Sequence, residues 1–351
     1  MRRVIVAAAG VLMLAAALIV FFRRAPAQAS RARTEAWAAG AAASRPVLGA
    51  NRTASGAHAG RLVVQGAWGG EPGQFGRRRD AESNPEGPMA LAASHGEIAV
   101  VDQINRRVQR FQNGKLVGAI SFGGDTVQDL ALAPGGRTVL LDRLVDGTVQ
   151  VYGPDGKLEN QVPIAGRGIE EGGDVTGVFA DDDGIYVERQ HGSVVRVADG
   201  RGATDADRPE LLGRPSRDGR FALQVEMGDR AAGELLVRAT NRGTGELAWV
   251  QTVRADAPVL HVVMLDSDRA GNVYVAAEVG RESAEPPYAI ADAHIVAVRL
   301  GPGGAPRGQL RLPPLGSADE TFRPLTVDDD GVLYLLLAQE SGLEVLRFIF
   351  G

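Results

Sequence analysis

Residues 69–111 read GGEPGQFGRRRDAESNPEGPMALAASHGEIAVVDQINRRVQRF and form the clearest β-unit of the chain. Short runs of aliphatic and β-branched residues alternate in this stretch with Gly, Asn and Ser, which is the pattern of strands joined by tight turns. With the residues that follow, it predicts four antiparallel strands in up-and-down order, over residues 89–92, 97–102, 108–111 and 116–122. Ile98, Val100 and Val101 do not alternate with polar residues, so we expect the second strand to be buried on both faces.

Fainter copies of this unit recur to the end of the sequence. They start at Val127, at Asp174, within 209–216, at Val259 and at Arg323. The last copy has three strands, and the run RLVVQGAW at 61–68 precedes the first unit without a partner of its own. Pairing these two segments closes a ring and removes exposed sheet edges, which promote aggregation.

The count of units predicts an all-β protein. We expect a six-bladed β-propeller of four-stranded antiparallel blades, closed by an N-terminal strand and preceded by one N-terminal hydrophobic helix. Seven blades or an open array are the alternatives. The boundary between the third and fourth units is placed only broadly, because residues 199–208 are polar and irregular.

The first unit resembles a blade of the NHL-repeat β-propeller family. The matching residues are Gly73, Gln74, Phe75, Pro85, Gly87, Gly96, Val101, Asp102, Asn105, Arg107, Val108, Gln109 and Phe111. The resemblance implies a propeller of, in most members, six blades. One blade carries the detailed match, and the other copies share its architecture. The surplus of Arg, Ala and Gly indicates a bacterial protein from a high-GC genome.

The N-terminal residues resemble a membrane-targeting segment. Residues 4–22 are apolar without interruption and are bracketed by arginines on both sides. As a helix they span about 28 Å, close to the roughly 30 Å of a bilayer's hydrocarbon core. Small residues at 25–29 resemble a signal-peptide cleavage site. We interpret 1–24 as a signal anchor or signal peptide, 25–60 as a disordered Ala/Arg/Ser-rich linker and 61–351 as the propeller. The propeller is then periplasmic on a bacterial inner-membrane helix, or periplasmic or secreted after cleavage.

Charge and cysteine content exclude several functions. Residues 1–59 carry eight arginines and one glutamate, a net charge of +7, which leaves −12 for residues 60–351 out of the total of −5. An acidic domain lacks the basic surface that nucleic-acid binding requires, so we expect no nucleic-acid partner. The chain has no cysteine, which excludes disulfides, thiolate metal sites and cysteine nucleophiles.

Polar residues on or just before the innermost strands can face the axial channel of a propeller. Five hold roughly equivalent positions in their units: Glu86, Asp129, Asp174, His261 and Arg323. Relatives of the NHL family with lyase or lactonase-like activity hold a divalent cation at such a place. The resemblance therefore implies, as an alternative, Ca²⁺ or Zn²⁺ on Asp129 and His261 that activates a water. Arg323 argues against a cation because a guanidinium is always charged, and we expect no cofactor.

Other charged segments are interpreted as ordinary loops. The acidic runs at 181–184, 266–271 and 328–331 are expected to be plain turns between the first and second strands of their blades. Ala270 stands where a calcium loop needs its third ligand. The basic cluster at 77–79 is expected to be solvated, with contact to anionic lipid or glycan as the alternative.

A long polar loop at 280–292 interrupts the fifth unit and is the candidate partner site. Its residues Glu282, Glu285, Pro286, Pro287 and Tyr288 stand on a rigid scaffold, where loops often bind partners. No G-x-S-x-G or Walker-type motif occurs in the chain. We expect non-catalytic binding or scaffolding at the bacterial cell envelope, with a protein partner and a membrane contact through the N-terminal helix. The alternative is a metal-dependent lyase or hydrolase in the axial channel, and a third interpretation is a sensor that binds a small ligand there without turning it over.

Overall fold

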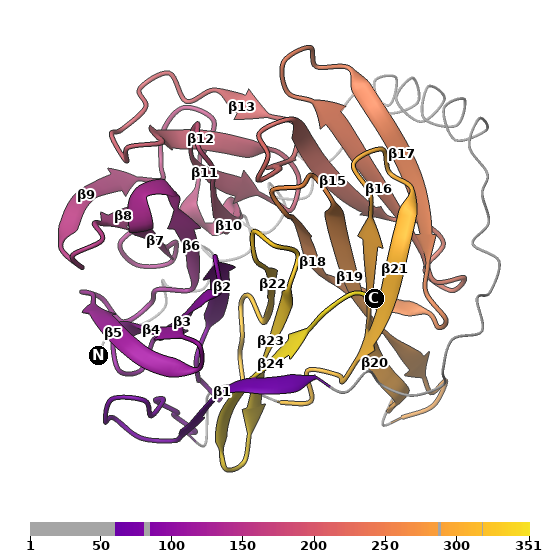
Figure 1. Cartoon of the computed structure of the whole chain (residues 1–351), viewed down its shortest axis with the longest axis horizontal. Coiled ribbons are helices and arrows are strands. Elements are labelled where there is room, and N and C mark those ends of the chain that lie inside the picture. Colours follow the sequence, from indigo (N-terminus) through magenta and orange to yellow (C-terminus); the bar gives the residue numbers. More distant parts are fainter. Residues whose placement is uncertain (1–59, 81–84, 287–288, 318) are drawn as a thin grey trace, which may run out of the picture. The chain divides into compact units, whose positions relative to one another are not determined.

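The computed structural model describes residues 60–351, except 81–84, 287–288 and 318. In this part of the chain, 24 strands form six four-stranded antiparallel sheets. The sheets stand as blades around a common axis, with one strand of each blade innermost (Figure 1). The predicted all-β, six-bladed architecture is confirmed. The predicted N-terminal helix and most of the linker lie outside the described residues, and among those described no helix is long and apolar enough to span a bilayer.

The blades are numbered here in chain order, and each is given from its innermost strand outward. Blade 1 contains β2 (Ala90–Ser94), β3 (Glu97–Asp102), β4 (Arg107–Gln112) and β5 (Lys115–Ser121). Blade 2 contains β6 (Asp129–Ala133), β7 (Arg137–Asp142), β8 (Thr148–Tyr152) and β9 (Leu158–Pro163). Blade 3 contains β10 (Val175–Ala180), β11 (Gly184–Arg189), β12 (Val194–Asp199) and β13 (Glu210–Leu211).

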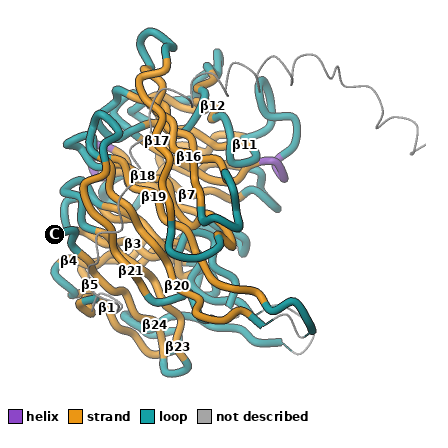
Figure 2. The backbone as a smooth tube through the Cα atoms, turned by 90° about the vertical axis from the view of Figure 1, so that its right-hand side faces the viewer, coloured by secondary structure: helices purple, strands orange, loops and turns teal. Residues whose placement is uncertain are grey.

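Blades 4 to 6 complete the ring. Blade 4 contains β14 (Arg214–Pro215), β15 (Phe221–Met227), β16 (Glu234–Asn241) and β17 (Leu247–Arg254). Blade 5 contains β18 (Val259–Ser267), β19 (Val273–Glu282), β20 (Ile290–Leu300) and β21 (Pro306–Leu312). Blade 6 contains β22 (Leu325–Val327), β23 (Leu333–Gln339), β24 (Gly342–Phe348) and β1 (Arg61–Ala67). Short 3₁₀ turns lie at Pro134–Gly136 and Gly172–Asp174, and the rest is strand and loop (Figure 2).

The ring is closed by the N-terminal strand. β1 pairs antiparallel with β24, with Val64 opposite Val345, so the strand predicted at 61–68 is the outermost strand of blade 6. The Trp68 indole N–H donates to the backbone oxygen of Gln339 at 3.0 Å and fixes the end of this strand. The N-terminal strand and the C-terminal strands therefore lie in one sheet. Without β1, blade 6 would have three strands, and β24 would be an exposed edge.

The residues that carry the family resemblance form one buried network in blade 1. The Asp102 carboxylate accepts from the Gly76 N–H at 2.8 Å, from Asn105 Nδ2 at 2.9 Å and from Arg107 Nε at 2.8 Å. The Gln109 amide oxygen accepts from the Gly73 N–H at 2.9 Å. These contacts tie the incoming loop to the second and third strands of the blade.

Five of the six interfaces between neighbouring blades hold a cluster of buried apolar side chains. The clusters join blades 1 and 2, blades 2 and 3, blades 4 and 5, blades 5 and 6, and blades 6 and 1. Among the described residues, no such cluster joins blades 3 and 4. We call this interface the blade 3–4 seam.

Arginines hold the blade 3–4 seam. Arg242, in the loop after β16, donates to Asp181 at 2.5 Å and to the Tyr186 hydroxyl at 2.8 Å in blade 3. The strands beside the seam are short: β13 and β14 have two residues each. Gly213 approaches the Leu223 carbonyl so closely that a Cβ would lie 2.4 Å from its oxygen, and Pro215 has no N–H to donate. Backbone crowding at this point therefore limits regular pairing.

The closing strand gives the first testable prediction. Val64 is 2% exposed, so Val64→Asp places a carboxylate in the cluster between blades 6 and 1 and is expected to cost about 3 kcal/mol of unfolding free energy. Leu62→Asp, on the same strand but 43% exposed, is the control and is expected to change it by about 0.5 kcal/mol or less. Urea unfolding of both variants measures the difference. Equal losses would show that β1 does not close the ring.

Candidate functional site

A cavity of about 430 Å³ lies where the innermost strands converge. All six blades line it. The contributions from blades 1 to 6 include Ala92, Ala131, Thr176, Arg214, His261 and Thr326, in that order. It opens where these strands begin, since Thr176 and His261 stand near the starts of β10 and β18. Its volume is in the range of small-molecule sites in proteins.

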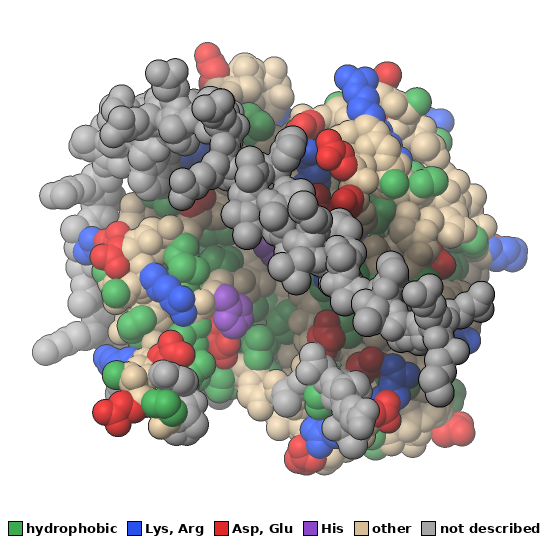
Figure 3. Space-filling view, turned by 180° about the vertical axis from the view of Figure 1, so that it is seen from behind, with side chains coloured by type: hydrophobic (Ala, Val, Ile, Leu, Met, Phe, Trp, Pro, Cys, Tyr) green, Lys and Arg blue, Asp and Glu red, His purple; other side chains and the backbone are tan. Residues whose placement is uncertain are grey.

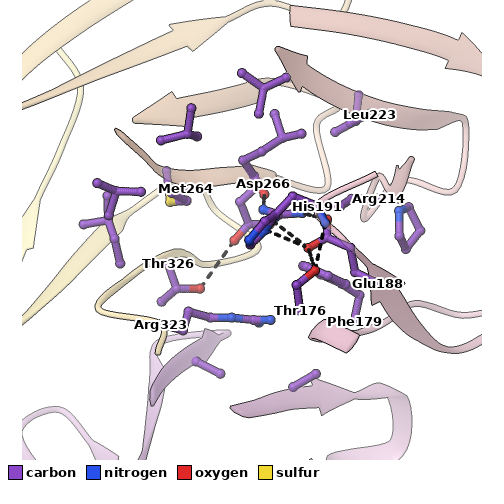
Figure 4. Close-up of a pocket in the computed structure, with 18 of the residues that line it drawn as sticks. Thr176, Phe179, Glu188, His191, Arg214, Leu223, Met264, Asp266, Arg323 and Thr326 are labelled. Atoms are coloured by element: carbon purple, nitrogen blue, oxygen red, sulfur yellow. Dashed lines mark hydrogen bonds and ion pairs between the residues drawn. The ribbon is translucent and has the colours of Figure 1, made fainter. Parts of the chain in front are cut away.

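Most of the cavity wall is apolar. Phe179, Leu223, Val225, Met264 and Leu325 lie around it, with alanines from blades 1, 2 and 3. Figure 4 shows Phe179, Leu223 and Met264 around a central group of polar side chains, and Figure 3 shows hydrophobic side chains gathered around a histidine in a hollow of one face. A wall of this kind binds apolar surface through the hydrophobic effect.

The central polar group is an ion pair across the blade 3–4 seam. Glu188 on β11 accepts from Arg214 Nε at 2.6 Å and from Arg214 Nη2 at 3.1 Å. Thr176 donates to the same carboxylate at 3.0 Å, and the His191 imidazole lies 3.5 Å from it. Burial alone raises the pKa of Glu188, but Arg214 and these neighbours overcome that effect and lower the pKa to about 2. Glu188 is therefore an ionised, fully engaged carboxylate.

A second ion pair crosses from blade 6 to blade 2. Asp129 is buried and accepts from Arg323 Nη2 at 2.5 Å and from the backbone N–H groups of Leu130 and Val178, both at 2.9 Å. Burial raises the pKa of the Asp129 carboxyl, while these three N–H donors favour its ionised form. Phe179 lies between two guanidinium groups, 4.8 Å from that of Arg323 and 4.9 Å from that of Arg214. The stack connects the two ion pairs.

Arg217 forms the floor of the cavity. From the β14–β15 turn it reaches Asp266 at 3.3 Å, the Ala93 carbonyl of blade 1 at 3.3 Å and the Val327 carbonyl of blade 6 at 2.6 Å. Arg217 also lines a smaller cavity of about 220 Å³ among the turns that follow the innermost strands. Arg217 therefore lies between the two cavities, together with Leu132 and Ala180, which also line both.

The five channel candidates from the sequence separate in the structure. Asp129 and Arg323 are in contact, and Arg323 and His261 line the same cavity. His261 stands at its rim on the innermost strand β18, 3.6 Å from Glu278. Glu86 pairs with Arg78, and Asp174 accepts from Gln190 at 3.0 Å; neither lines the cavity. The five do not converge on one centre.

The site does not fit a divalent cation. Both Asp129 oxygens accept from N–H donors, and the permanently charged Arg323 lies against one of them. Within the described ranges, no three His, Asp or Glu side chains gather as metal ligands would. Asp129 and His261 therefore do not form a ligand set for Ca²⁺ or Zn²⁺.

The partner-loop candidates lie on an extended hairpin. β19 and β20 are the longest strands of the described chain, and Glu282, Glu285 and Pro286 are exposed near the tip. Pro287 and Tyr288 lie outside the described residues. Figure 2 shows the elongated strands of this blade from the side. The structure thus presents the hairpin to solvent, and its role in binding a partner stays a prediction.

The basic cluster corrects one expectation. Arg77 was expected to be solvated, but its side chain is 9% exposed and lies 2.8 Å from the buried Asp319, with its guanidinium 4.7 Å from the Trp68 ring centre. Burial against blade 6 explains the difference. The acidic turns behave as expected: Asp181, Asp268 and Asp328 each accept a backbone N–H of their own turn.

Sequence reasoning did not identify Glu188, Arg214, Arg217 and Asp266 as residues of the cavity. Glu188 lies at the next-to-last position of β11, and Arg214 falls within 209–216, where the start of the fourth unit was placed only broadly. A charged residue inside an aliphatic strand, as in IYVER, was the available signal.

No family model and no curated protein matches this chain. Among solved structures, it is similar to a Kuenenia stuttgartiensis hydrazine synthase chain at 13% identity, over 74% of this chain and 78% of that one, with a TM-score of 0.48. Staphylococcus aureus virginiamycin B lyase is 8% identical over 78% and 87%, with a TM-score of 0.40. A luciferin-regenerating enzyme is 12% identical over 74% and 90%, with a TM-score of 0.42. These likenesses carry no argument about activity.

The depressed pKa of Glu188 gives the second prediction. The stability it contributes is present above its ordinary pKa of 4.5 and is lost as the pH falls toward 2. Glu188→Gln is therefore expected to cost on the order of 3 kcal/mol at pH 7 and less than half of that near pH 3. Urea unfolding across this range measures it. Glu340→Gln, at a side chain 85% exposed, should have little effect at any pH, and a Glu188→Gln loss independent of pH would contradict the assignment.

Proposed function

We propose that this chain is a non-catalytic binding propeller of the bacterial cell envelope, and that its axial cavity binds a small organic molecule. The observation that carries the proposal is the state of the cavity's charged groups. Glu188 and Asp266, which line the cavity, and Asp129, which is buried behind its wall, are each engaged by an arginine. A general base or nucleophile needs a carboxylate that can reach the substrate, whereas these carboxylates hold the ring together.

The wider assignment rests on the sequence. The Asp102 network supports placing blade 1 near the NHL-repeat propellers, and the apolar residues 4–22 support export on an inner-membrane anchor or as a cleaved precursor. The exposed β19–β20 hairpin is the proposed contact for a protein partner at the envelope. Rigid propellers suit this role because they hold such loops in fixed positions.

A screen for ligands that are bound but not converted tests the proposal. The full chain is screened with a library of small organic molecules by thermal unfolding, and every compound is recovered and analysed by mass spectrometry. We expect compounds that raise the Tm and are recovered unchanged; a ligand at about 100 times its Kd adds about 2.7 kcal/mol. Conversion of any compound, with or without added Ca²⁺ or Zn²⁺, would contradict the proposal.

Two glycine variants locate the binding. Gly192 lines the cavity, and a Cβ added there meets only backbone oxygens at 3.4 Å and 3.9 Å, so the backbone accepts a side chain at this position, and Gly192→Phe is designed to fill the mouth. It is expected to abolish the ligand-dependent rise in Tm. Gly303, in an outer turn of blade 5, has nothing within 4 Å of an added Cβ, and Gly303→Phe should leave the rise intact. Equal effects would place the binding elsewhere.

A further inference from the structure

We infer that the ligand of the axial cavity is an uncharged, mostly apolar molecule with one hydrogen-bonding end, and that it completes the packing of the blade 3–4 seam. The inference rests on the proposed function, because both concern the same cavity. Three features lead to it: the balance of charge in the wall, the missing apolar cluster at the seam, and the polar rim.

The charges of the cavity wall cancel. Its three arginines, Arg214, Arg217 and Arg323, pair with Glu188, Asp266 and Asp129 respectively. The Arg217 guanidinium already contacts two carboxylates, those of Asp266 and Asp329, and two backbone carbonyls, those of Ala93 and Val327. Its charge is therefore compensated before any ligand binds. A charged ligand entering this wall would lose its hydration and find no uncompensated partner, which is costly. An uncharged ligand avoids that cost.

The seam lacks what the other interfaces have. Each of the other five holds an apolar cluster, whereas blades 3 and 4 meet through Arg242 and Arg214. Phe179 of blade 3 and Val225 of blade 4 are only partly buried and line the cavity from the two sides of the seam, whereas Leu223 is 1% exposed and packs in the cluster between blades 4 and 5. An apolar molecule between Phe179 and Val225 buries surface that this interface otherwise leaves in contact with the cavity.

The rim supplies a polar contact. The imidazoles of His191 and His261 line the opening, with side chains 74% and 53% exposed. A neutral imidazole offers one donor and one acceptor, so either ring can bind a hydroxyl, an ester or a carbonyl at the outer end of a ligand. The ligand is therefore expected to lie with its apolar part toward Arg217 and its polar end toward solvent.

A series of compounds that share one ring system and differ in charge tests the proposed class of ligand. The neutral dye 6-propionyl-2-(dimethylamino)naphthalene, whose emission shifts in apolar surroundings, is titrated into the full chain at pH 7. It is then displaced with methyl 2-naphthoate, 2-naphthoate or 2-naphthylmethylammonium, which share one ring system and differ in charge. We expect the dye to bind and the ester to displace it at least about tenfold more effectively than either ion.

Two variants test the balance itself. Glu188→Gln leaves Arg214 without its carboxylate and is expected to improve displacement by 2-naphthoate about tenfold relative to the ester. Asp266→Asn leaves Arg217 only Asp329, 3.6 Å away, and is expected to change displacement in the same direction by a smaller factor. A merely structural role of these carboxylates would weaken all three naphthalenes alike. Asp266→Asn serves as the second variant if Glu188→Gln does not fold.

Hydrogen exchange tests the seam. Binding of the dye is expected to slow exchange of amides in β10, β14 and β15 more than in the outer strands β5 and β9. Dye binding with preferential displacement by 2-naphthoate in the unmodified chain would overturn the ligand class and leave the proposed function standing. A dye and competitors that do not bind at all, in a folded chain, would overturn both. Protection confined to strands away from the seam would overturn the packing role.

Discussion

The interface between blades 3 and 4 depends on arginine–carboxylate pairs where every other interface depends on apolar contact. Arg214 and Arg242 reach from blade 4 to Glu188 and Asp181 of blade 3. Breaking a buried pair leaves an uncompensated charge, so these contacts are costly to lose even though a pair by itself adds little stability. The seam is therefore closed by ion pairs, and one of them, between Arg214 and Glu188, lies in the wall of the axial cavity that all six blades line.

The same side chains determine the electrostatics of the axis. Arg217 and Arg323 extend from their own blades to blades on the other side of the ring, where they meet backbone carbonyls as well as carboxylates. A guanidinium has five donors in a fixed plane and can satisfy several acceptors at once. Three arginines can therefore lie near one axis without destabilising the ring, because each is compensated by a carboxylate. For the same reason, the net charge of the cavity wall is close to zero.

Much of the fold could be predicted from the sequence. Alternation of aliphatic runs with Gly-rich turns indicated the strands, and the unpaired run at 61–68 indicated how the ring closes. The cavity could not be predicted in the same way. Glu188 and Arg214 are 26 positions apart, and their meeting depends on the path of the irregular segment between β12 and β14, where local pattern is weakest. Arg77 shows the same limit: a basic loop residue is buried because blade 6, more than 200 residues later, supplies Asp319 and a place to pack.

The channel candidates illustrate what position alone can say. Asp129 and Arg323 were selected because they hold equivalent places in their units, and they do meet at the axis. Glu86 and Asp174 hold similar places, but Glu86 pairs with Arg78 of its own loop and Asp174 accepts from Gln190 in the turn after β11 of the same blade. Equivalent positions in the repeats thus place residues at the same end of their blades. Which residue each side chain binds depends on contacts that the repeat pattern does not predict.

The central claim is that the blade 3–4 seam holds an uncharged ligand in the axial cavity. A crystal structure of the full chain soaked with methyl 2-naphthoate tests it most directly. We expect the naphthalene ring between Phe179 and Val225, on the cavity side of Arg217, with the ester toward His191 or His261. A ring bound anywhere else on the propeller, with this cavity unchanged, would contradict it.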